Sequence, residues 1–371
     1  MIRTIDECFF QIQNGANIKQ GDTDGGFPIT RIETIANDKF NRDRMGFAGI
    51  TDISKYESYV LEDGDLLMSH INSVQYLGRT VLYVRRPEET IIHGMNLLRL
   101  KARRDIINPA YARYCFYGHP FRSQVGNITK KSVNQASFAV KDLKQIKIDI
   151  PSLAEQEEIV GILDKIQRLV ELRTDELLKI DNLIKARFVE LFGDPIVNSM
   201  SWAEELIGDS CFVTKLAGFE YTQYIHYEDS GDVVMVKAQN VKNGKLNRKD
   251  LSYIANEVSD SLPRSQLATG DVVMTYVGAN IGDVAIIDDE YKYHLAPNVA
   301  KIRPDSEKFN SIYLMYMLMF LNSYIVGNSA DTAKAALGME RIRKLKVFVP
   351  PITLQKQFAT FVAQVDKSKF I

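Results

Sequence analysis

An internal repeat constrains this chain more than any other feature of its sequence. The segment Leu61-Glu-Asp-Gly-Asp-Leu-Leu-Met68 is similar to Leu267-Ala-Thr-Gly-Asp-Val-Val-Met274, which lies 206 residues further along. Matching residues around this segment recur at offsets of 203, 202 and 199, and they pair Cys8 with Cys211, Asn108 with Asn310, and Pro151 with Pro350. Because chance matches would scatter in offset, the chain is predicted to contain two copies of one domain.

Each copy is predicted to be an α+β domain. Short β-branched runs separated by Gly and Asp are typical of strands and turns. They occupy residues 29–35, 66–71 and 80–84 in the first copy and residues 233–236, 272–277 and 284–287 in the second. A helix is expected after an asparagine cap in each copy, at Asn108 and Asn310. Alternating residues at 143–150 and 345–349 predict a closing edge strand. The two domains are placed at residues 1–150 and 196–349.

Between the copies, residues 151–195 are predicted to form a long helix. Ser152-Leu-Ala-Glu155 is a capping box, and Gly193 and Pro195 mark the helix end. The 41 residues from Ser152 to Phe192 give a rod of roughly 60 Å. Apolar residues recur every seven positions at Leu163, Val170, Leu177, Ile184 and Leu191. A core helix of one domain is an alternative, but this spacing between duplicated domains favours a spacer that packs against a helical partner.

A second, shorter helix is predicted at residues 350–371, packed antiparallel to the first. At an offset of 199 the counterpart of Phe192 would be residue 391, which lies 20 positions beyond Ile371. The second helix is therefore expected to cover only the far half of the first, around Leu177, Ile180, Ile184 and Leu191. The near half is predicted to be a subunit interface formed by Ile159, Ile162, Leu163, Ile166, Leu169 and Val170.

The composition is that of a folded soluble protein, with 45% hydrophobic and 25% charged residues. The odd count of three cysteines, with no Cys-x-x-Cys pair, favours a reducing compartment. Acidic residues near the N-terminus do not fit a signal peptide, and the longest apolar run, residues 312–321, is too short to cross a bilayer. A cytoplasmic protein without a membrane partner is expected.

Two local strings imitate catalytic sites. Asn108-Pro-Ala-Tyr111 is similar to the Asn-Pro-Pro-Tyr loop of adenine methyltransferases, but the second copy reads Asn310-Ser-Ile-Tyr313. Proline after an asparagine cap explains the first string without catalysis. Asp271 with Glu290 and Lys292 could form a nuclease carboxylate set, although the acidic segment also fits a hairpin turn. Neither a zinc nor a phosphate-loop pattern occurs, so no catalytic residue and no metal site are predicted.

Charge is distributed unevenly even though the total is near zero. Residues 1–150 contain 21 Lys and Arg against 17 Asp and Glu, residues 151–195 contain 6 against 10, and residues 196–371 contain 19 against 20. Basic clusters interleaved with Tyr, Asn and Gln suit phosphate contact and base-edge recognition. Ordinary solvated surfaces look the same, so charge alone leaves both interpretations open.

The segments around the two helices carry a family resemblance. Pro151-Ser-Leu-Ala-Glu-Gln-Glu-Glu-Ile159 and Lys185-Ala-Arg-Phe-x-Glu-Leu-Phe-Gly-Asp-Pro195 resemble the central conserved region of the specificity subunit of type I restriction–modification enzymes. Pro350-Pro-Ile-x-Leu-Gln-x-Gln-Phe358 resembles the distal conserved region of that family. The resemblance spans nearly the whole chain as an architecture, and the second helix is shorter than the family pattern.

The resemblance implies a non-catalytic DNA reader. Two repeated target-recognition domains would each read one half of a bipartite, asymmetric site in double-stranded DNA, and the helices would set the gap. Such a subunit assembles with two modification subunits, which use S-adenosylmethionine, and with restriction subunits, which use ATP and Mg²⁺. No cofactor is expected on this chain, and self-association through the central helix is expected when the partners are absent. The alternatives are a catalytic DNA methyltransferase or nuclease chain and a helical scaffold protein without DNA affinity.

Candidate DNA contacts fall in the loops that follow the Gly-Asp strands. These loops, residues 70–79 and 276–280, are polar, aromatic and punctuated by glycine. The residues predicted to read bases are His70, Asn72, Gln75 and Arg79 in the first domain and Tyr276 and Asn280 in the second. The residues predicted to contact phosphates are Lys130, Lys131, Lys245, Arg248 and Lys249. An ordinary surface loop is the alternative for each of them.

Overall fold

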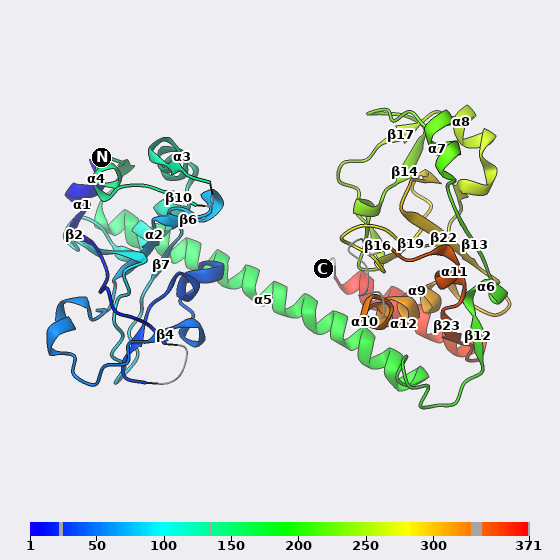
Figure 1. The fold of residues 1–371 in the computed structure, drawn as a ribbon, viewed down its shortest axis with the longest axis horizontal. Coiled ribbons are helices and arrows are strands. Elements are labelled where there is room, and N and C mark those ends of the chain that lie inside the picture. Colours follow the sequence, from blue (N-terminus) through cyan, green and yellow to red (C-terminus); the bar gives the residue numbers. More distant parts are fainter. Residues whose placement is uncertain (22–24, 134, 328–335, 370–371) are drawn as a thin grey trace. The chain divides into compact units, whose positions relative to one another are not determined.

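The computed structural model describes residues 1–21, 25–133, 135–327 and 336–369. The chain divides into two compact units, which we call unit 1 (Met1–Leu172) and unit 2 (Arg173–Ile371). The long helix α5 (Leu153–Phe192) begins in unit 1 and ends in unit 2 (Figure 1). No helix of the described residues has the length and apolar character needed to cross a membrane.

Unit 1 is built around a four-stranded antiparallel sheet of order β2-β8-β5-β7. Its strands are β2 (Phe9–Asn14), β5 (Leu66–Ser69), β7 (Thr80–Leu82) and β8 (Leu97–Ala102). Successive side chains of β5 point to opposite faces and both faces are covered, so Leu66 and Leu67 are both fully buried. Two apolar clusters therefore sandwich the sheet.

The remaining elements of unit 1 surround this sheet. Its helices are α1 (Ile5–Cys8), α2 (Pro109–Tyr117), α3 (His119–Ile128) and α4 (Val140–Lys144). Strand β1 (Ile2–Thr4) pairs with β11 (Lys147–Asp149), and β3 (Pro28–Ile29) pairs with β4 (Gly46–Phe47). A separate three-stranded ribbon has the order β6-β10-β9, with β6 (Ile71–Asn72), β9 (Lys130–Lys131) and β10 (Ala136–Ser137).

Unit 2 repeats this plan. Its sheet β13-β22-β19-β20 corresponds to β2-β8-β5-β7, and its strands are β13 (Cys211–Lys215), β19 (Val272–Thr275), β20 (Val284–Ile286) and β22 (Val299–Pro304). Strands β12 (Glu204–Leu206) and β23 (Lys346–Phe348) pair as β1 and β11 do. The predicted duplication and the α+β class are confirmed by this common topology.

Unit 2 also carries elements beyond the shared sheet. A second sheet, β17-β14-β21-β18, consists of β14 (Val233–Val236), β17 (Tyr253–Ile254), β18 (Gln266–Leu267) and β21 (Lys292–Leu295). Strands β15 (Val241–Lys242) and β16 (Lys245–Leu246) form a hairpin. The helices are α6 (Ile207–Ser210), α7 (Gly218–Tyr224), α8 (Asn256–Ser261), α9 (Ser311–Phe320), α10 (Asn322–Gly327), α11 (Met339–Arg343) and α12 (Ile352–Ser368).

A buried glutamine joins the α+β domain to the helix that follows it in both units. In unit 1, Oε1 of Gln156 on α5 accepts from the Asn108 backbone N–H at 2.8 Å, and its Nε2 donates to the carbonyls of Ile106 and Pro151 at 3.0 Å. In unit 2, Gln355 on α12 accepts from Asn310 N–H at 2.8 Å and donates to two carbonyls in the same way. Both glutamine side chains are fully buried. We call each arrangement a glutamine clamp.

The asparagine caps and the capping box are confirmed. Asn108 Oδ1 accepts from the Ala110 N–H at 2.8 Å at the start of α2, and Asn310 does the same for Ile312 at 3.0 Å at the start of α9. At the start of α5, Ser152 Oγ accepts from the Glu155 N–H while Glu155 accepts from the Ser152 N–H. These caps fix the helix starts because the first N–H groups of a helix lack internal partners.

Helix α12 packs antiparallel to the end of α5, as predicted. The Phe358 ring, near the start of α12, lies 5.6 Å from the Phe192 ring, near the end of α5. At the other end of the contact, Arg173 donates to the Lys369 carbonyl at 2.6 Å. Ile184 is fully buried in this contact region and Leu191 packs at its edge.

Two predicted strands were partly wrong. Residues 29–35 form only the short strand β3 followed by a 3₁₀ helix, Ile32–Asp38. Within that segment Thr34 uses its side chain to accept from the Arg31 N–H and to donate to the Arg44 carbonyl. These local bonds compete with strand pairing. Residues 143–150 begin in α4 and become strand only at β11.

Candidate functional site

The ribbon of unit 1 brings together residues predicted separately as base and phosphate contacts. In its register Asn72 lies opposite Ala136, which in turn lies opposite Lys131. The next rung joins Ile71, Ser137 and Lys130. Residues directly opposite share a face of the sheet and successive residues alternate, so the two lysines point to opposite faces of β9. Asn72 is half-buried, and its Oδ1 accepts from the Ser73 N–H at 2.8 Å.

The loop between β6 and β7 is held in shape by two arginines. Arg122 of α3 donates to the Leu77 carbonyl at 2.6 Å. Arg79 pairs with Asp38 at 2.9 Å and stacks over the Tyr76 ring at 4.6 Å. Gln75 is exposed at the surface of this loop. These contacts fix the conformation of the loop, and Gln75 and the Tyr76–Arg79 stack lie on its surface.

His70 does not belong to this exposed set, and its prediction as a base contact needs correction. Its side chain is only 5% exposed and its ring packs edge-on against Phe138 at 6.4 Å. Burial lowers the pKa of His70 to about 4, so the ring is neutral near pH 7. A ring enclosed in this way has no free edge for a base in this conformation.

The corresponding loop of unit 2 follows β19. Tyr276 is half-buried, its N–H donates to the Asn298 carbonyl at 2.9 Å, and its carbonyl accepts from Leu337 at 2.8 Å. The Lys215 ammonium lies 5.4 Å from the Tyr276 ring centroid, in a cation–π contact. Asn280 is exposed in the same loop. Lys215 was missed from sequence because it is a single basic residue at the end of a strand, outside any cluster.

The residues predicted to contact phosphates differ in whether they form ion pairs within the protein. Lys130 and Lys131 are exposed, and neither has an ion-pair partner within the described residues. Lys249 is also exposed. Lys245 pairs with Asp366 at 3.3 Å, and Arg248 pairs with two carboxylates, those of Asp288 at 2.5 Å and Glu290 at 2.6 Å. The charge of Arg248 is therefore already compensated within the protein.

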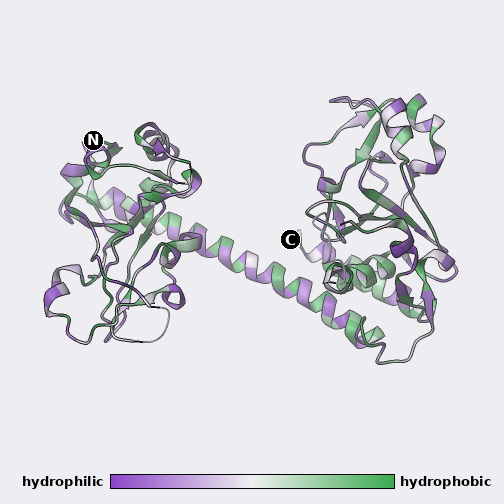
Figure 2. Cartoon of the chain, in the orientation of Figure 1, coloured by the Kyte–Doolittle hydropathy of each residue, from purple (hydrophilic) through white to green (hydrophobic). Residues whose placement is uncertain are grey.

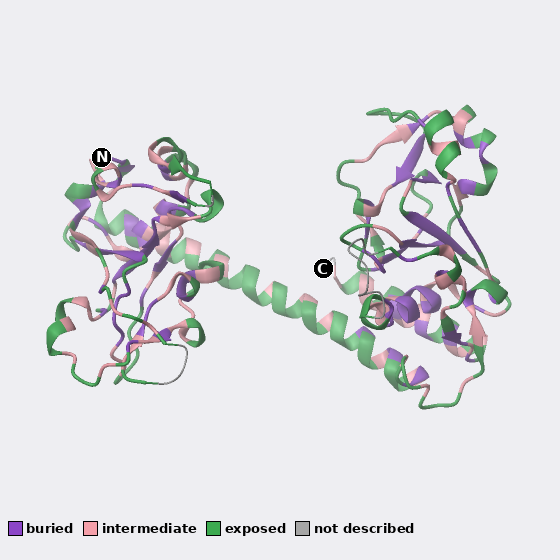
Figure 3. Cartoon of the chain, in the orientation of Figure 1, coloured by how far each residue is buried: buried purple, intermediate pink, exposed green. Residues whose placement is uncertain are grey.

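The predicted subunit interface on α5 is largely exposed. Figure 2 shows hydrophobic and hydrophilic residues alternating along α5, and Figure 3 shows how much of the helix is exposed. Ile159 and Leu163 are half-buried, and Ile159 packs against the core of unit 1. The other side chains are at least half exposed, at 50% for Ile162, 51% for Ile166, 65% for Leu169 and 60% for Val170. We call these last four residues the apolar stripe of α5.

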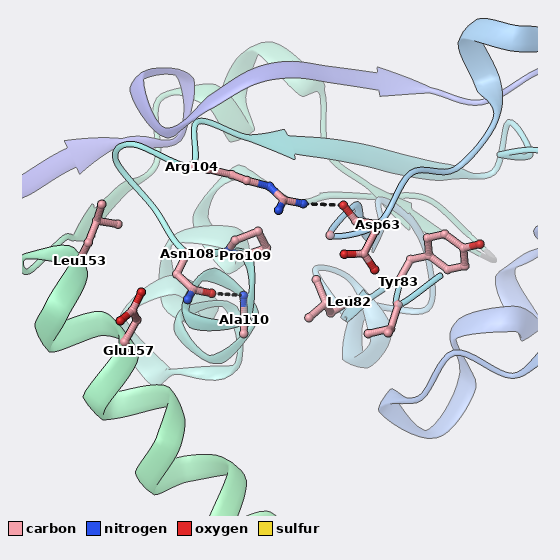
Figure 4. Close-up of a pocket in the computed structure, with 11 residues that line it drawn as sticks. Asp63, Leu82, Tyr83, Arg104, Asn108, Pro109, Ala110, Leu153 and Glu157 are labelled. Atoms are coloured by element: carbon pink, nitrogen blue, oxygen red, sulfur yellow. Dashed lines mark hydrogen bonds between the residues drawn. The ribbon is translucent and has the colours of Figure 1, made fainter. Parts of the chain in front are cut away.

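The methyltransferase-like string of unit 1 lines a cavity of about 350 Å³ (Figure 4). Asn108 and Pro109 form one side of this cavity, and Arg104, which donates to the Asp63 carbonyl at 2.5 Å, forms another. The Asn108 carboxamide oxygen caps α2, and the Tyr111 hydroxyl donates to the Asp149 carbonyl at 3.0 Å. Asn108 and Tyr111 of the methyltransferase-like string therefore both have structural roles.

The carboxylates of the nuclease-like set also form ion pairs with arginines of the protein. The Asp271 carboxylate, which is buried, forms a two-pronged pair with Arg303 at 2.6 and 2.7 Å. Glu290 pairs with Arg248 on the surface. Within the residues that the structure describes, no group of three or more His, Cys, Asp or Glu side chains is arranged to hold a metal ion.

Sequence analysis also missed a pair of buried cations in equivalent positions. The guanidinium of Arg99 on β8 donates to the carbonyls of Val60 and Ser58, at 2.9 and 2.6 Å. Lys301 on β22, 202 residues later, donates to the carbonyls of Arg264 and Gln266 at 2.7 Å. Both are 1% exposed, and burial lowers the pKa of Lys301 to about 8. Their shared offset was a usable signal, but the sequence alone does not show that either side chain is buried.

Two copies of one α+β domain, together with a long helix, are the features that define the structural class of this protein. That fold is shared with the crystal structure of a type I restriction–modification S subunit from M. genitalium, with a TM-score of 0.60 at 14% identity over 100% of this chain and 90% of that one. A second structure, described as addressing complex assembly and conformational transition of the type I system, gives 0.54 at 15% identity, covering 100% and 90%.

Sequence comparison then places the chain in a family. A model described as the type I restriction modification DNA specificity domain matches residues 2–182 and again residues 208–371. A putative type I restriction enzyme specificity subunit (MjaX) from Methanocaldococcus jannaschii is 27% identical over 98% of this chain and 86% of its own length. The EcoKI specificity subunit of Escherichia coli is 24% identical over 49% of this chain and 40% of its own length. The protein belongs to the family of type I restriction–modification specificity subunits.

Proposed function

We propose that this chain gives a type I restriction–modification complex its DNA sequence specificity, with each unit reading one half of a bipartite site. The observation that carries the proposal is the duplication of the exposed polar loop. In unit 1 the loop after β5 carries Gln75, which is exposed, and Asn72 and Arg79, which are half-buried. In unit 2 the loop after β19 carries Asn280, which is exposed, and Tyr276, which is half-buried. Amide and guanidinium groups are the side chains that read base edges in the major groove. Their repetition on one fold suits two half-sites.

Positive charge supports the same assignment. Lys130 and Lys131 stand on the ribbon that also carries Asn72, and Lys215 stands beside Tyr276. Phosphate contacts position a reader and base contacts specify the sequence, so each unit offers both kinds of group in one place. Arg248 stays a predicted phosphate contact, although it would have to exchange its ion pairs with Asp288 and Glu290 for the phosphate.

Catalysis is assigned to partner subunits in this proposal. The asparagine of the methyltransferase-like string serves as a helix cap, and the carboxylate of Asp271 is held by Arg303. S-adenosylmethionine would be bound by two modification subunits, and ATP and Mg²⁺ by restriction subunits. This chain would contribute recognition and assembly alone.

Domain exchange tests the recognition part of the proposal. The full chain, assembled with its modification subunits, is used to select DNA from a randomised duplex pool. Replacing residues 1–150 with the corresponding domain of another family member is expected to change one half-site and leave the other half-site and the gap unaltered. A change in both half-sites, or the absence of any selected sequence, would contradict the proposal.

The apolar stripe of α5 is proposed to dock the modification subunits, or a second copy of this chain when they are absent. Four side chains that are at least half exposed on one helix are unusual for a solvated surface. Ile166→Glu combined with Leu169→Glu is expected to reduce co-purification of the modification subunit at least ten-fold. Val84→Glu, which changes an exposed valine elsewhere in unit 1, is the control. Unchanged assembly with the double variant would remove the stripe from the interface.

A further inference from the structure

The hairpin formed by β9 and β10 in unit 1 ends in an exposed apolar side chain that the polar loops do not explain. Val133 lies at its tip and is fully exposed, at 100%. The hairpin is closed by Ser132, whose N–H and hydroxyl both donate to the Gln135 carbonyl at 2.8 Å. An aliphatic side chain in this position packs against nothing within the described part of the chain.

The two lysines beside the tip constrain what the hairpin fits. Lys130 and Lys131 point to opposite faces of β9, because successive residues of a strand alternate. A flat anionic surface would engage one face and leave the other lysine in solvent. A groove with a phosphate backbone on each wall engages both. The major groove of B-DNA is about 12 Å wide, admits a two-stranded β-ribbon such as the hairpin formed by β9 and β10, and has such walls.

A ribbon placed in this way brings its tip to the floor of the groove. The groove floor carries one apolar group that a valine can contact, which is the C5-methyl group of thymine. We propose that Val133 is a specificity-determining residue of unit 1 that reads a thymine methyl group, while Lys130 and Lys131 contact the phosphates on the two walls. The inference rests on the proposed DNA-reading function and assigns one part of it to one side chain.

The test measures coupling between Val133 and a single methyl group. The full chain with its modification subunits first selects duplexes from a randomised pool. Each thymine of the selected half-sites is then replaced, one at a time, by deoxyuridine, which lacks only the methyl group. For the unaltered protein, one such replacement in the half-site read by unit 1 is expected to weaken binding about four-fold, the equivalent of one buried methyl group.

Three variants separate the possible causes. Val133→Ala is expected to bind the thymine and deoxyuridine duplexes equally and to keep the same salt dependence. Val84→Ala, which shortens another exposed valine of unit 1, is expected to behave as the unaltered protein. Lys131→Ala is expected to weaken binding to all sequences and to reduce the salt slope by about one phosphate contact. Because Val133 is fully exposed, the alanine variant is expected to fold as the parent does.

Each contrary result has a distinct meaning. If no sequence is selected by the unaltered complex, the proposed function fails. If selection succeeds but Val133→Ala keeps the full response to deoxyuridine at every position, the role of Val133 is overturned. A unit 1 half-site without any thymine on either strand overturns it as well. If Val133→Ala loses the modification subunit with its DNA preference unchanged, the tip is a protein contact and the inference is wrong.

Discussion

The two units hold the same helix by different chemistry. Unit 1 contacts α5 beyond the glutamine clamp chiefly through polar groups. The Tyr114 hydroxyl donates to Asp164 at 2.6 Å, Arg113 donates to Gln167 at 3.0 Å, and Lys39 pairs with Glu171 at 3.0 Å. Ile159 and Val160 add a small apolar contact at the start of the helix.

Unit 2 encloses its part of α5 in an aromatic cluster. The ring of Phe188 stacks on Tyr313 with centroids 5.7 Å apart and meets Phe358 edge-on at 5.4 Å. Phe188 and Phe192 are both fully buried. Buried aromatic rings stabilise a contact far more than exposed ion pairs do. The glutamine clamp is common to both units, whereas the remaining contacts at the two ends of α5 differ in chemistry.

The largest effect that separates the two attachments is expected from Phe188→Ala. Removing a fully buried ring costs about 3–5 kcal/mol, so the free energy of unfolding of unit 2 should fall by that amount. Hydrogen exchange of α9 and α12, followed by mass spectrometry, measures it. Leu178→Ala, at an exposed position of the same helix, is the control and should change it by less than about 0.5 kcal/mol. Equal effects of the two variants would show that the aromatic cluster does not anchor the helix.

Acid is expected to lower the stability of unit 1 more than that of unit 2, and this effect is intermediate in size. Burial lowers the pKa of His70 to about 4 and that of His93 to about 3, whereas in unfolded chains both titrate near 6.5. The unfolded state therefore binds more protons below pH 6.5, and stability falls as the pH drops from there toward 4. At pH 5.5 each histidine costs about 1.4 kcal/mol, or about 3 kcal/mol for unit 1.

Unit 2 contains a single buried histidine of this kind, His294, whose pKa is also lowered chiefly by burial. Hydrogen exchange at pH 7.5 and 5.5, corrected for the intrinsic pH dependence, should show a larger loss of protection in unit 1 than in unit 2. His70→Gln should reduce the acid response of unit 1 by about half. Equal acid responses of the two units would mean that these histidines do not govern stability.

The smallest effect is expected from Tyr114→Phe. The variant removes the hydroxyl that bonds Asp164 and keeps the ring, so the contact of unit 1 with α5 should weaken by about 1 kcal/mol. Local hydrogen exchange in the first half of α5 is the measurement, and Tyr76→Phe, at an exposed tyrosine of the same unit, is the control. A loss as large as that of Phe188→Ala would erase the contrast between the units.

Local signals and the repeat were sufficient to predict most of the fold. The asparagine caps at Asn108 and Asn310, the capping box at Ser152 and the heptad spacing each specify a conformation within a few residues, and the structure has all of them. The second copy served as an independent check, because a pattern that recurs 200 residues later reports on the fold rather than on composition.

Contacts between distant segments could not be read from the sequence. His70 was taken for an exposed loop residue because it follows the strand β5, yet Phe138, 68 positions later, packs against it. The run at residues 29–35 has the β-branched composition of a strand, but Thr34 bonds to the Arg44 carbonyl and Asn37 adopts a positive φ of 56°. The ribbon that joins Asn72 to Lys131 has strands of only two residues, too short for any periodicity to reveal.

The glutamine clamps bear on how such a protein can change its target. Every group that Gln156 and Gln355 bind is a backbone carbonyl or N–H, and none is a side chain. The bonds of the clamp therefore do not depend on which side chains the domain carries, unlike the Tyr114–Asp164 and Phe188–Tyr313 contacts with α5. Under the function proposed above, mutation or recombination could change the DNA-reading surface while the clamp keeps its backbone bonds, so new target sequences could evolve on the same scaffold.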